Sequence, residues 1–387
     1  MGYLTEERIM LRDAAREFAL KEVLPVANRL DPEKGDIPPE LIEKLAQLGY
    51  FGIMIPEEYG GMGLGCFEYC LVSQELSRAW MSVGSIIRSG NILIGSNELS
   101  EERRKKYLTR AARGEFLGAL AMSEPNAGSD VGNISTRAVK KGDHWSITGS
   151  KYWCTFADGA DYITVVARTD PDVDPGRKHR GLSVFLVEKP RGELPRGVSG
   201  NPIPKIGYYG WKTWELAFDD ARVPLDAIIG AEGRGFYIIS RELETGRAHT
   251  AARAIGVAQG AYEDALAYAQ EREQFNRPIA DFQAIRFKLA KMKIEIEAAQ
   301  QLMYYVCDAI DSGRRCDREA AMVKYYAGEM AERVTSEALQ IHGGAGYTTH
   351  FAAERYWRDA RLTKIFEGTS EIQLRIVSDH ILGKAGQ

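Results

Sequence analysis

The stretch HWSITGSKYWCT, residues 144–155, decides the fold class because its residue pattern differs from that of the long regions on either side. It is rich in β-branched and aromatic residues, which favour strands over helices. Similar stretches, separated by glycine, proline and aspartate turns, recur further along the chain. They occupy residues 161–170, 181–189 and 214–224. We therefore expect an antiparallel β-domain in the middle of the chain.

Apolar residues recur with helical spacing before and after these stretches. Ile9, Phe18 and Val23 mark one face near the N-terminus, and long helical patterns cover residues 281–311 and 317–344. Strands and helices do not alternate, so a Rossmann-type fold is not expected. We predict an α+β protein with an N-terminal α-helical domain, an antiparallel β-domain and a C-terminal helical bundle. The predicted boundaries are residues 1–118, 119–230 and 231–387.

The composition is that of an ordinary globular protein. The 387 residues are 44% hydrophobic and 27% charged, and a net charge of −4 offers no basic excess for nucleic-acid binding. No apolar run reaches the roughly 20 residues of a membrane span, and the N-terminus enters a helical pattern directly. We therefore predict no membrane span and a cytoplasmic protein, although a processed organellar protein would look the same. Five cysteines without CxxC spacing predict neither a disulfide framework nor a zinc site.

Common motifs of metalloproteases, P-loop proteins and serine hydrolases are absent, since the sequence has no HExxH, GxxxxGK[ST] or GxSxG pattern. Two stretches could instead hold an anionic or a flat ligand. Residues 120–130, LAMSEPNAGSD, combine small residues with main-chain N–H groups that could bind a pyrophosphate, although a plain β-turn explains them as well. Trp153 and Thr155 point to one face of an alternating strand, where they suit either the edge of a flavin ring or core packing.

A further stretch, KIFEGTSEIQ at residues 364–373, holds a glutamate that helix signals do not explain. Thr369 or Ser370 fits a helix N-cap, and Glu371 fits the first helical turn. Glu367 has no such role, and it follows the apolar residues Ile365 and Phe366. A function for this carboxylate is therefore expected.

Six motifs follow one another along the chain: EEYGGMGLG (57–65), SEPNAGSD (123–130), ITGSKYWCT (147–155), REQFNRPIADFQAI (272–285), QIHGGAGY (340–347) and IFEGTSEIQ (365–373). Together and in this order they resemble the acyl-CoA dehydrogenase family over essentially the whole chain. The resemblance implies that the antiparallel middle domain is β-barrel-like and that the C-terminal bundle is a four-helix bundle. The resemblance implies an FAD-dependent flavoprotein oxidoreductase that converts an acyl-CoA thioester to the 2-enoyl-CoA in fatty-acid or aromatic-acid degradation. It also implies a homo-oligomer, usually a tetramer, with an electron-transferring flavoprotein as electron acceptor.

The same resemblance makes Glu367 the catalytic base that removes the α-proton while the β-carbon gives hydride to flavin N5. A structural carboxylate is the alternative. We expect Ile365 and Phe366 to form an apolar, closed site that raises the pKa of Glu367. Some family members place the base on the first helix of the bundle, but the matching residue here is Gly246, which cannot act. The main-chain N–H of Glu367 and a flavin ribityl hydroxyl would polarise the thioester carbonyl.

The resemblance also assigns the binding residues. The flavin and its pyrophosphate would be lined by Met122, Ser123, Ser129, Trp153 and Thr155. FAD in a neighbouring subunit would be reached by Arg272, Phe275, Gln283, Gln340, Gly343 and Gly344, with Thr369 and Glu371 near the adenosine end. The acyl-CoA would meet Arg88, Ser129, Arg247 and Phe366.

Arg88 departs from the family pattern because it lies in an apolar helical stretch, GSIIRSGNILIG, at the acyl end of the pocket. In glutaryl-CoA dehydrogenases an arginine and a serine of this helix meet the distal carboxylate; the matching residues here are Gly84 and Arg88. We expect Arg88 to bind an anionic distal group, which predicts a dicarboxylic substrate such as a substituted succinyl- or glutaryl-CoA. An internal salt bridge to Glu75 is the alternative.

Other readings stay open. Trp211 and Trp214 add bulk near the expected substrate entrance, where surface packing explains them as well as substrate contact does. A flavoprotein of this fold could also decarboxylate or desulfinate a CoA thioester, or act on short- or branched-chain monocarboxylic acyl-CoAs. A non-catalytic subunit is a further alternative, but it predicts lost flavin or base motifs, and these motifs are present.

Overall fold

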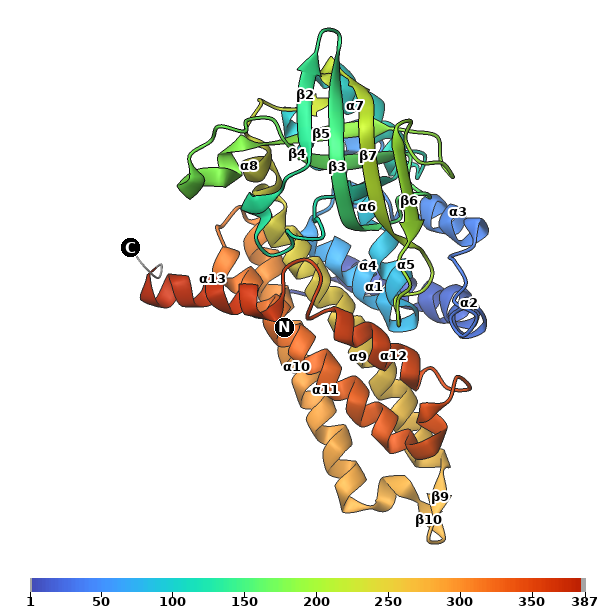
Figure 1. Cartoon of the computed structure of the whole chain (residues 1–387). Coiled ribbons are helices and arrows are strands. Elements are labelled where there is room, and N and C mark those ends of the chain that lie inside the picture. Colours follow the sequence, from blue (N-terminus) through green and yellow to red (C-terminus); the bar gives the residue numbers. More distant parts are fainter. Residues whose placement is uncertain (1, 384–387) are drawn as a thin grey trace.

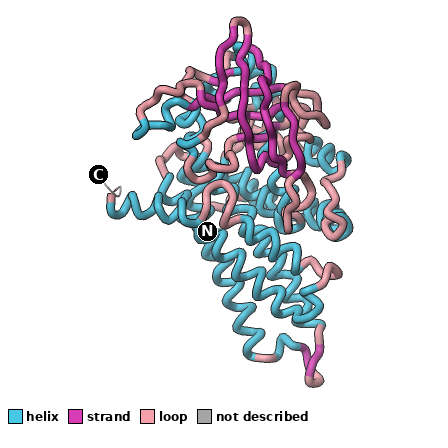
Figure 2. The backbone as a smooth tube through the Cα atoms, viewed as in Figure 1, coloured by secondary structure: helices cyan, strands magenta, loops and turns pink. Residues whose placement is uncertain are grey.

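The computed structural model describes residues 2–383 of the chain. Helices, then strands, then helices follow one another, which confirms the predicted α+β order. In Figure 1 the sheet lies at the top, most of the N-terminal helices lie below it, and the long C-terminal helices extend away from both. Figure 2 shows most strands gathered in the upper part of the molecule and a short strand pair at the lower end of the long helices. Among residues 2–383, no helix is both long and apolar enough to cross a membrane. The domain boundaries stay a prediction.

The N-terminal region is built around α4 (Cys66–Ala79), a helix in which nearly every residue is buried. Its one deeply buried acid, Glu75, is balanced by Arg78 at 2.7 Å and Arg16 at 3.1 Å. An unpaired charge at such a position would be costly, so these contacts permit burial on all sides. The other helices are α1 (Glu6–Phe18), α2 (Leu24–Leu30), α3 (Pro39–Gln47), α5 (Met81–Ile86), α6 (Arg88–Asn91) and α7 (Glu101–Ala112).

The middle region forms one eight-stranded sheet whose neighbouring strands are mostly antiparallel. Its strands are β1 (Gly118–Ala121), β2 (Arg137–Lys141), β3 (His144–Thr155), β4 (Tyr162–Arg168), β5 (Leu182–Glu188), β6 (Val198–Pro202), β7 (Thr213–Pro224) and β8 (Ile228–Ile229). They lie in the order β6-β7-β3-β2-β4-β5-β8, and β1 pairs with β4 in parallel. A register shift interrupts the pairing of β3 with β7 between Lys151 and Cys154. Trp153 lies there with a φ of 67°, so simple strand alternation does not hold between Trp153 and Thr155.

The C-terminal region depends on close packing of α9 (Leu243–Glu271) against α4. A Cβ atom on Gly256 would lie 2.1 Å from the main-chain oxygen of Gln74, and one on Gly260 would lie 2.4 Å from that of Arg78. Only glycine permits this approach. The remaining elements are α8 (Gly235–Arg241), the hairpin β9 (Glu273–Gln274) and β10 (Arg277–Pro278), α10 (Gln283–Asp311), α11 (Asp317–His342), α12 (Ala353–Leu362) and α13 (Ser370–Leu382).

A buried ion pair attaches the loop after β1 to β3. Lys151 is fully buried and donates to the Met122 carbonyl and to Glu124, each at 2.9 Å. Glu124 also accepts from the main-chain N–H groups of Ser135 and Thr136 at 2.8 and 2.9 Å. Burial would raise the pKa of Glu124, but Lys151 outweighs it and lowers that pKa to about 2. Burial lowers the pKa of Lys151 to about 8, so both groups are charged at neutral pH.

Replacing this buried lysine should therefore destabilise the protein. Lys151→Met leaves Glu124 charged and unpaired, which we expect to cost about 3–5 kcal/mol of unfolding free energy. Denaturant unfolding followed by circular dichroism measures this. The matched control is Lys141→Met, because Lys141 pairs with Asp220 at 2.7 Å on the surface and should leave the unfolding midpoint nearly unchanged. Equal midpoints for the two variants would contradict the structural role of Lys151.

Candidate active site

The turn between α12 and α13 presents Glu367 in an unusual backbone conformation. Glu367 has a φ of 54° and Gly368 a φ of 94°, so two successive residues are left-handed. The turn ends at Thr369, whose side chain accepts from the Ile372 N–H at 3.3 Å and caps α13 as predicted. Left-handed backbone is uncommon for a residue with a side chain and is often retained for function.

Two donors hold the turn by the carbonyl of Gly368. Lys324 of α11 donates to it at 2.5 Å and Gln373 of α13 at 3.0 Å. Lys324 is 1% exposed, and burial lowers its pKa to about 8. A buried lysine thus fixes the peptide between Gly368 and Thr369, one residue beyond Glu367.

The carboxylate of Glu367 contacts α9 through both oxygens. Oε1 accepts from Nη2 of Arg253 at 2.5 Å, and Oε2 lies 3.1 Å from the Thr250 hydroxyl. Arg253 is 1% exposed, whereas the Glu367 side chain is 28% exposed. The same guanidinium lies 4.7 Å from the centre of the Phe366 ring. The Glu367 carboxylate is therefore held by α9 on one side, and the side chain is partly exposed on the other.

The expectation that the pKa of Glu367 is raised is wrong. The surrounding protein alone would raise it, but the positive charge of Arg253, followed by that of Arg88, lowers the pKa to about 2. The prediction considered only the sequence neighbours, and Ile365 does not enclose the site, because it is 52% exposed. Arg253 lies 114 positions away in the sequence.

Aromatic and polar side chains line the region around this carboxylate. Tyr69 of α4 stacks on His249 of α9 with ring centres 4.6 Å apart, and Tyr208 meets Phe366 edge-on at 5.7 Å. His249 is fully buried, and its Nε2 lies 3.1 Å from the Gly84 carbonyl. Burial and nearby Arg253 lower the pKa of His249 well below its usual value, so the ring is neutral and Nε2–H donates to that carbonyl. Within residues 2–383, Nδ1 of His249 and the hydroxyl of Tyr69 are buried without a hydrogen-bond partner.

Arg88 is the first residue of α6 and faces the region around Glu367. Among residues 2–383 it forms no salt bridge. The predicted alternative, a pair with Glu75, is wrong because Glu75 pairs with Arg78 and Arg16. Among the described residues, Nε of Arg88 is buried without a hydrogen-bond partner. Its charge acts on Glu242, but burial outweighs that effect and raises the pKa of Glu242. Arg88 thus forms no salt bridge among the described residues, although its charge acts on the carboxylates of Glu242 and Glu367.

The first group of residues predicted to hold FAD comes together beside β3. Met122 and Ser123 follow β1, and their carbonyls accept from Lys151 and from the Tyr152 N–H. Trp153 is 56% exposed although it is a large apolar ring. Ser129 lies in the adjoining exposed loop. An exposed flat ring beside small polar groups fits an isoalloxazine, so these residues could hold a flavin.

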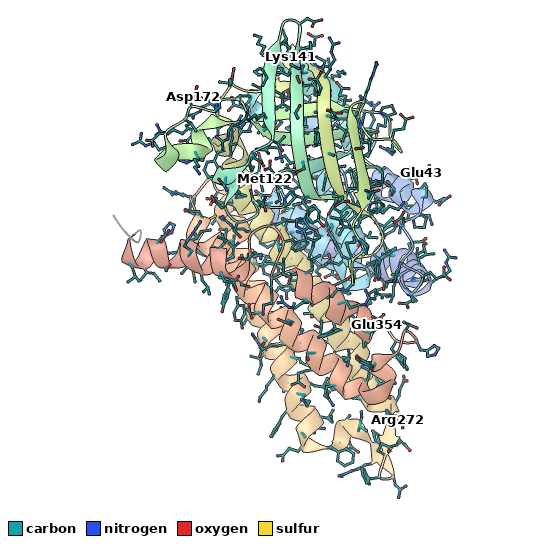
Figure 3. All side chains as sticks on the ribbon, viewed as in Figure 1. Glu43, Met122, Lys141, Asp172, Arg272 and Glu354 are labelled. Atoms are coloured by element: carbon teal, nitrogen blue, oxygen red, sulfur yellow. The ribbon has the colours of Figure 1, made fainter. Side chains whose placement is uncertain are left out.

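The second predicted group lies elsewhere in the same chain. Figure 3 labels Met122 below the sheet and Arg272 at the far end of the long helices. Phe275 lies on the hairpin near Arg272 and is 88% exposed. One chain therefore does not bring the two groups together. The other members, Gln283, Gln340, Gly343 and Gly344, are also exposed.

The remaining predicted residues lie at or near Glu367. Arg247 is buried on α9, directly after Gly246. A Cβ atom on Gly246 would lie 3.7 Å from Oε2 of Glu367, so the alternative base position faces the same carboxylate. Glu371 is exposed in the first turn of α13.

Several residues of this site were missed by sequence reasoning. Arg253 carried one usable signal, because it follows Gly246 by seven residues and two helical turns place both on one face. Thr250, four residues after Gly246, shares that signal. No local pattern points to Lys324, Tyr69 or His249. These three side chains come from separate helices that meet only in the folded chain.

Two features outside the site concern predicted alternatives. Trp211 is buried between Tyr208 and Phe156, at ring distances of 5.3 and 5.8 Å, which favours packing over substrate contact.

Three cysteines meet between α4 and α10, with all sulfur atoms within 4.8 Å of one another. Burial raises the pKa of Cys70 well above its usual value, so these groups pack as neutral thiols. The three are Cys66, Cys70 and Cys307.

The order of helices, sheet and helices, with the exposed Trp153 ring beside small polar groups, suits a flavin-dependent oxidoreductase. Three family models of acyl-CoA dehydrogenases match the chain: the N-terminal domain at residues 5–115, the middle domain at 119–221 and the C-terminal domain at 233–382. The chain belongs to the acyl-CoA dehydrogenase family. Members are FAD-dependent oxidoreductases, so FAD is the expected cofactor.

Relatives span nearly the whole chain. An acyl-CoA dehydrogenase of Bacillus subtilis (strain 168) is 41% identical over 385 residues, which cover 98% of this chain and 99% of the relative. A (2S)-methylsuccinyl-CoA dehydrogenase of Cereibacter sphaeroides is also 41% identical, over 98% of this chain and 70% of its own. A solved structure of a glutaryl-CoA dehydrogenase with glutaryl-CoA has a TM-score of 0.91 at 34% identity and covers 98% of this chain and 96% of that chain.

Replacing Lys324, which holds the turn that carries Glu367, should slow flavin reduction. Lys324→Met removes the donor to the Gly368 carbonyl and loosens Glu367, which we expect to lower the rate constant for flavin reduction by acyl-CoA about 10–100-fold. Anaerobic stopped-flow absorbance measures it. Lys106→Met is the control, because Lys106 pairs with Glu188 on the surface. A wild-type rate constant in Lys324→Met would show that the turn does not need this donor.

Proposed function

We propose that this protein dehydrogenates an acyl-CoA thioester between the α- and β-carbons, with FAD as hydride acceptor and Glu367 as the base. The observation that supports this most is the geometry of Glu367: a left-handed residue whose carboxylate is anchored by Arg253 while its side chain stays 28% exposed. A carboxylate that only stabilised the fold would not need to face outward. The family assignment supports the reaction class.

The chain supplies binding, orientation and proton transfer. When bound, FAD supplies the two-electron acceptor. Glu367 would take the α-proton, and its main-chain N–H, which donates to no group among residues 2–383, is free to polarise the thioester carbonyl. Trp153, Thr155 and the loop after β1 would hold the flavin beside this turn.

The electron acceptor would be an electron-transferring flavoprotein, as in the family. The separation of the two predicted FAD-binding groups supports a homo-oligomer in which Arg272, Phe275 and Gln283 of one subunit reach the FAD of another. A tetramer is the state that the family resemblance predicts. A cytoplasmic location also stays a prediction.

The substrate would be a dicarboxylic acyl-CoA of the substituted succinyl or glutaryl type. Arg253 and Arg88 both act on the carboxylate of Glu367, but only Arg253 forms a salt bridge with it. Arg253 is paired, so Arg88 remains to attract an anion at the distal end of the acyl group. The methylsuccinyl-CoA and glutaryl-CoA dehydrogenases among the relatives support this assignment. The alternatives are a reaction that removes carbon dioxide or a sulfino group, and a short or branched monocarboxylic substrate.

A panel of acyl-CoAs tests the reaction and the substrate together. Mixed anaerobically with the FAD-loaded enzyme, methylsuccinyl-CoA or glutaryl-CoA should bleach the oxidised flavin band faster than butyryl-CoA. Mass spectrometry should then show a 2-enoyl-CoA of unchanged carbon number. A shortened product would favour decarboxylation, sulfite released from a sulfinyl-acyl-CoA would favour desulfination, and no bleaching by any acyl-CoA would contradict dehydrogenation.

Arg88 should set the preference for the distal charge. Arg88→Gln removes a charged donor, so kcat/KM for the dicarboxylic substrate should fall about 10–100-fold, while that for butyryl-CoA changes little. Arg113→Gln, an exposed arginine after α7, is the matched control. If the ratio of the two kcat/KM values stays the same in Arg88→Gln, the substrate assignment is wrong.

A further inference from the structure

Arg253 is held rigidly by contacts on several sides. Its Nη1 donates to the Ser85 hydroxyl at 3.0 Å, and its Nη2 reaches both the Thr250 hydroxyl at 3.0 Å and Oε1 of Glu367 at 2.5 Å. Its Nε lies 3.4 Å from the His249 carbonyl. A planar guanidinium with several fixed partners and 1% exposure has little freedom to turn.

The two oxygens of Glu367 are held very differently. Oε1 receives the charged hydrogen bond from Arg253, which is the stronger kind. Oε2 has only the Thr250 hydroxyl at 3.1 Å, and that hydroxyl also lies 2.9 Å from the Gly246 carbonyl. A hydroxyl has one proton, so it cannot donate fully to both acceptors. Oε2 is therefore the oxygen with spare capacity to accept a proton.

We propose that Arg253 is a positioning residue for the dehydrogenation: it fixes Oε1 of Glu367 and thereby makes Oε2 the atom that takes the α-proton. This inference rests on the proposed function. In the step, the α-carbon–hydrogen bond breaks, an Oε2–H bond forms, and the hydride from the β-carbon goes to the flavin. Because Oε1 cannot rotate away, the carboxylate needs no reorientation before each turnover.

The same contact determines how activity depends on pH. Glu367 acts as a base only when ionised, and with its pKa near 2 it is ionised at every pH at which the protein is studied. Without Arg253, fewer positive charges oppose the effect of burial, so the pKa of Glu367 rises. Activity is then lost as the pH falls through this higher pKa. The other charged or titratable groups that act on Glu367 are Arg88 of α6, Tyr69 of α4, His249 of α9, Tyr208 of the β6–β7 loop and Lys324 of α11.

Arg253→Gln tests the proposal in the FAD-loaded enzyme. Its kcat/KM should fall steeply below about pH 6, whereas the wild-type value should stay flat there. Its kcat should also fall about 10-fold or more because the carboxylate is no longer oriented, while KM changes much less. Arg253→Lys keeps a charge and should retain the flat profile while losing part of kcat.

A matched control separates orientation from the general cost of removing a buried arginine. Arg355 is 3% exposed, donates to Asn28 and to the Ala79 carbonyl and does not contact Glu367. Arg355→Gln should lower thermal stability without changing the pH profile. The proposal is overturned if Arg253→Gln keeps both a flat pH profile of kcat/KM and the wild-type kcat. It is also overturned if Arg253→Gln and Arg355→Gln change that profile equally.

The proposed function can fail separately. If no acyl-CoA bleaches the wild-type flavin, dehydrogenation itself is wrong. If bleaching occurs and Arg253→Gln matches wild type at every pH, only the role of Arg253 is wrong. Should Arg253→Gln not fold with flavin bound, Arg253→Lys decides: a kcat equal to wild type overturns the fixed orientation, and a lower kcat at an unchanged KM supports it.

Discussion

The contact between Arg253 and Glu367, 2.5 Å long, joins the turn between α12 and α13 to α9. Its position depends on the packing beneath it. α9 can carry Arg253 to this place because Gly256 and Gly260 let it lie directly against α4. The turn can carry Glu367 there because Lys324 and Gln373 hold the Gly368 carbonyl. The geometry of the site is therefore a consequence of how α4, α9 and α11 pack.

Electrostatics around this contact support the proposed anionic acyl group. Arg253 and Arg88 both lower the pKa of Glu367, but only Arg253 forms an ion pair with it. The buried polar atoms nearby, on Tyr69, His249 and Arg88, have no protein partner among residues 2–383. Buried polar groups normally have partners, so a region with several unpaired ones favours a polar ligand over a plain alkyl chain.

The fold could be predicted from local patterns, whereas the electrostatics of the site could not. The change from helical to strand composition near residue 120 indicated the α–β–α order, and Thr369 was recognisable as a helix cap from its position alone. The pKa of Glu367 was predicted in the wrong direction because its main partner, Arg253, is distant in sequence. A bulge in β3 changed the orientation of Trp153 in a way that strand alternation does not anticipate. Such features arise from tertiary contacts, which a single sequence does not display.

The central claim is that one carboxylate removes the α-proton, and relocating it tests this most directly. The rate constant for anaerobic flavin reduction should be measured in Glu367→Gln and in Glu367→Gln combined with Gly246→Glu. The first variant should bind FAD but reduce it about 10²–10⁴-fold more slowly, because no base is left. The second should recover part of the rate, since a Cβ atom at position 246 lies 3.7 Å from the place of Oε2 in the wild-type Glu367, so a glutamate there enters the same region. Flavin reduction at the wild-type rate in Glu367→Gln would contradict the account.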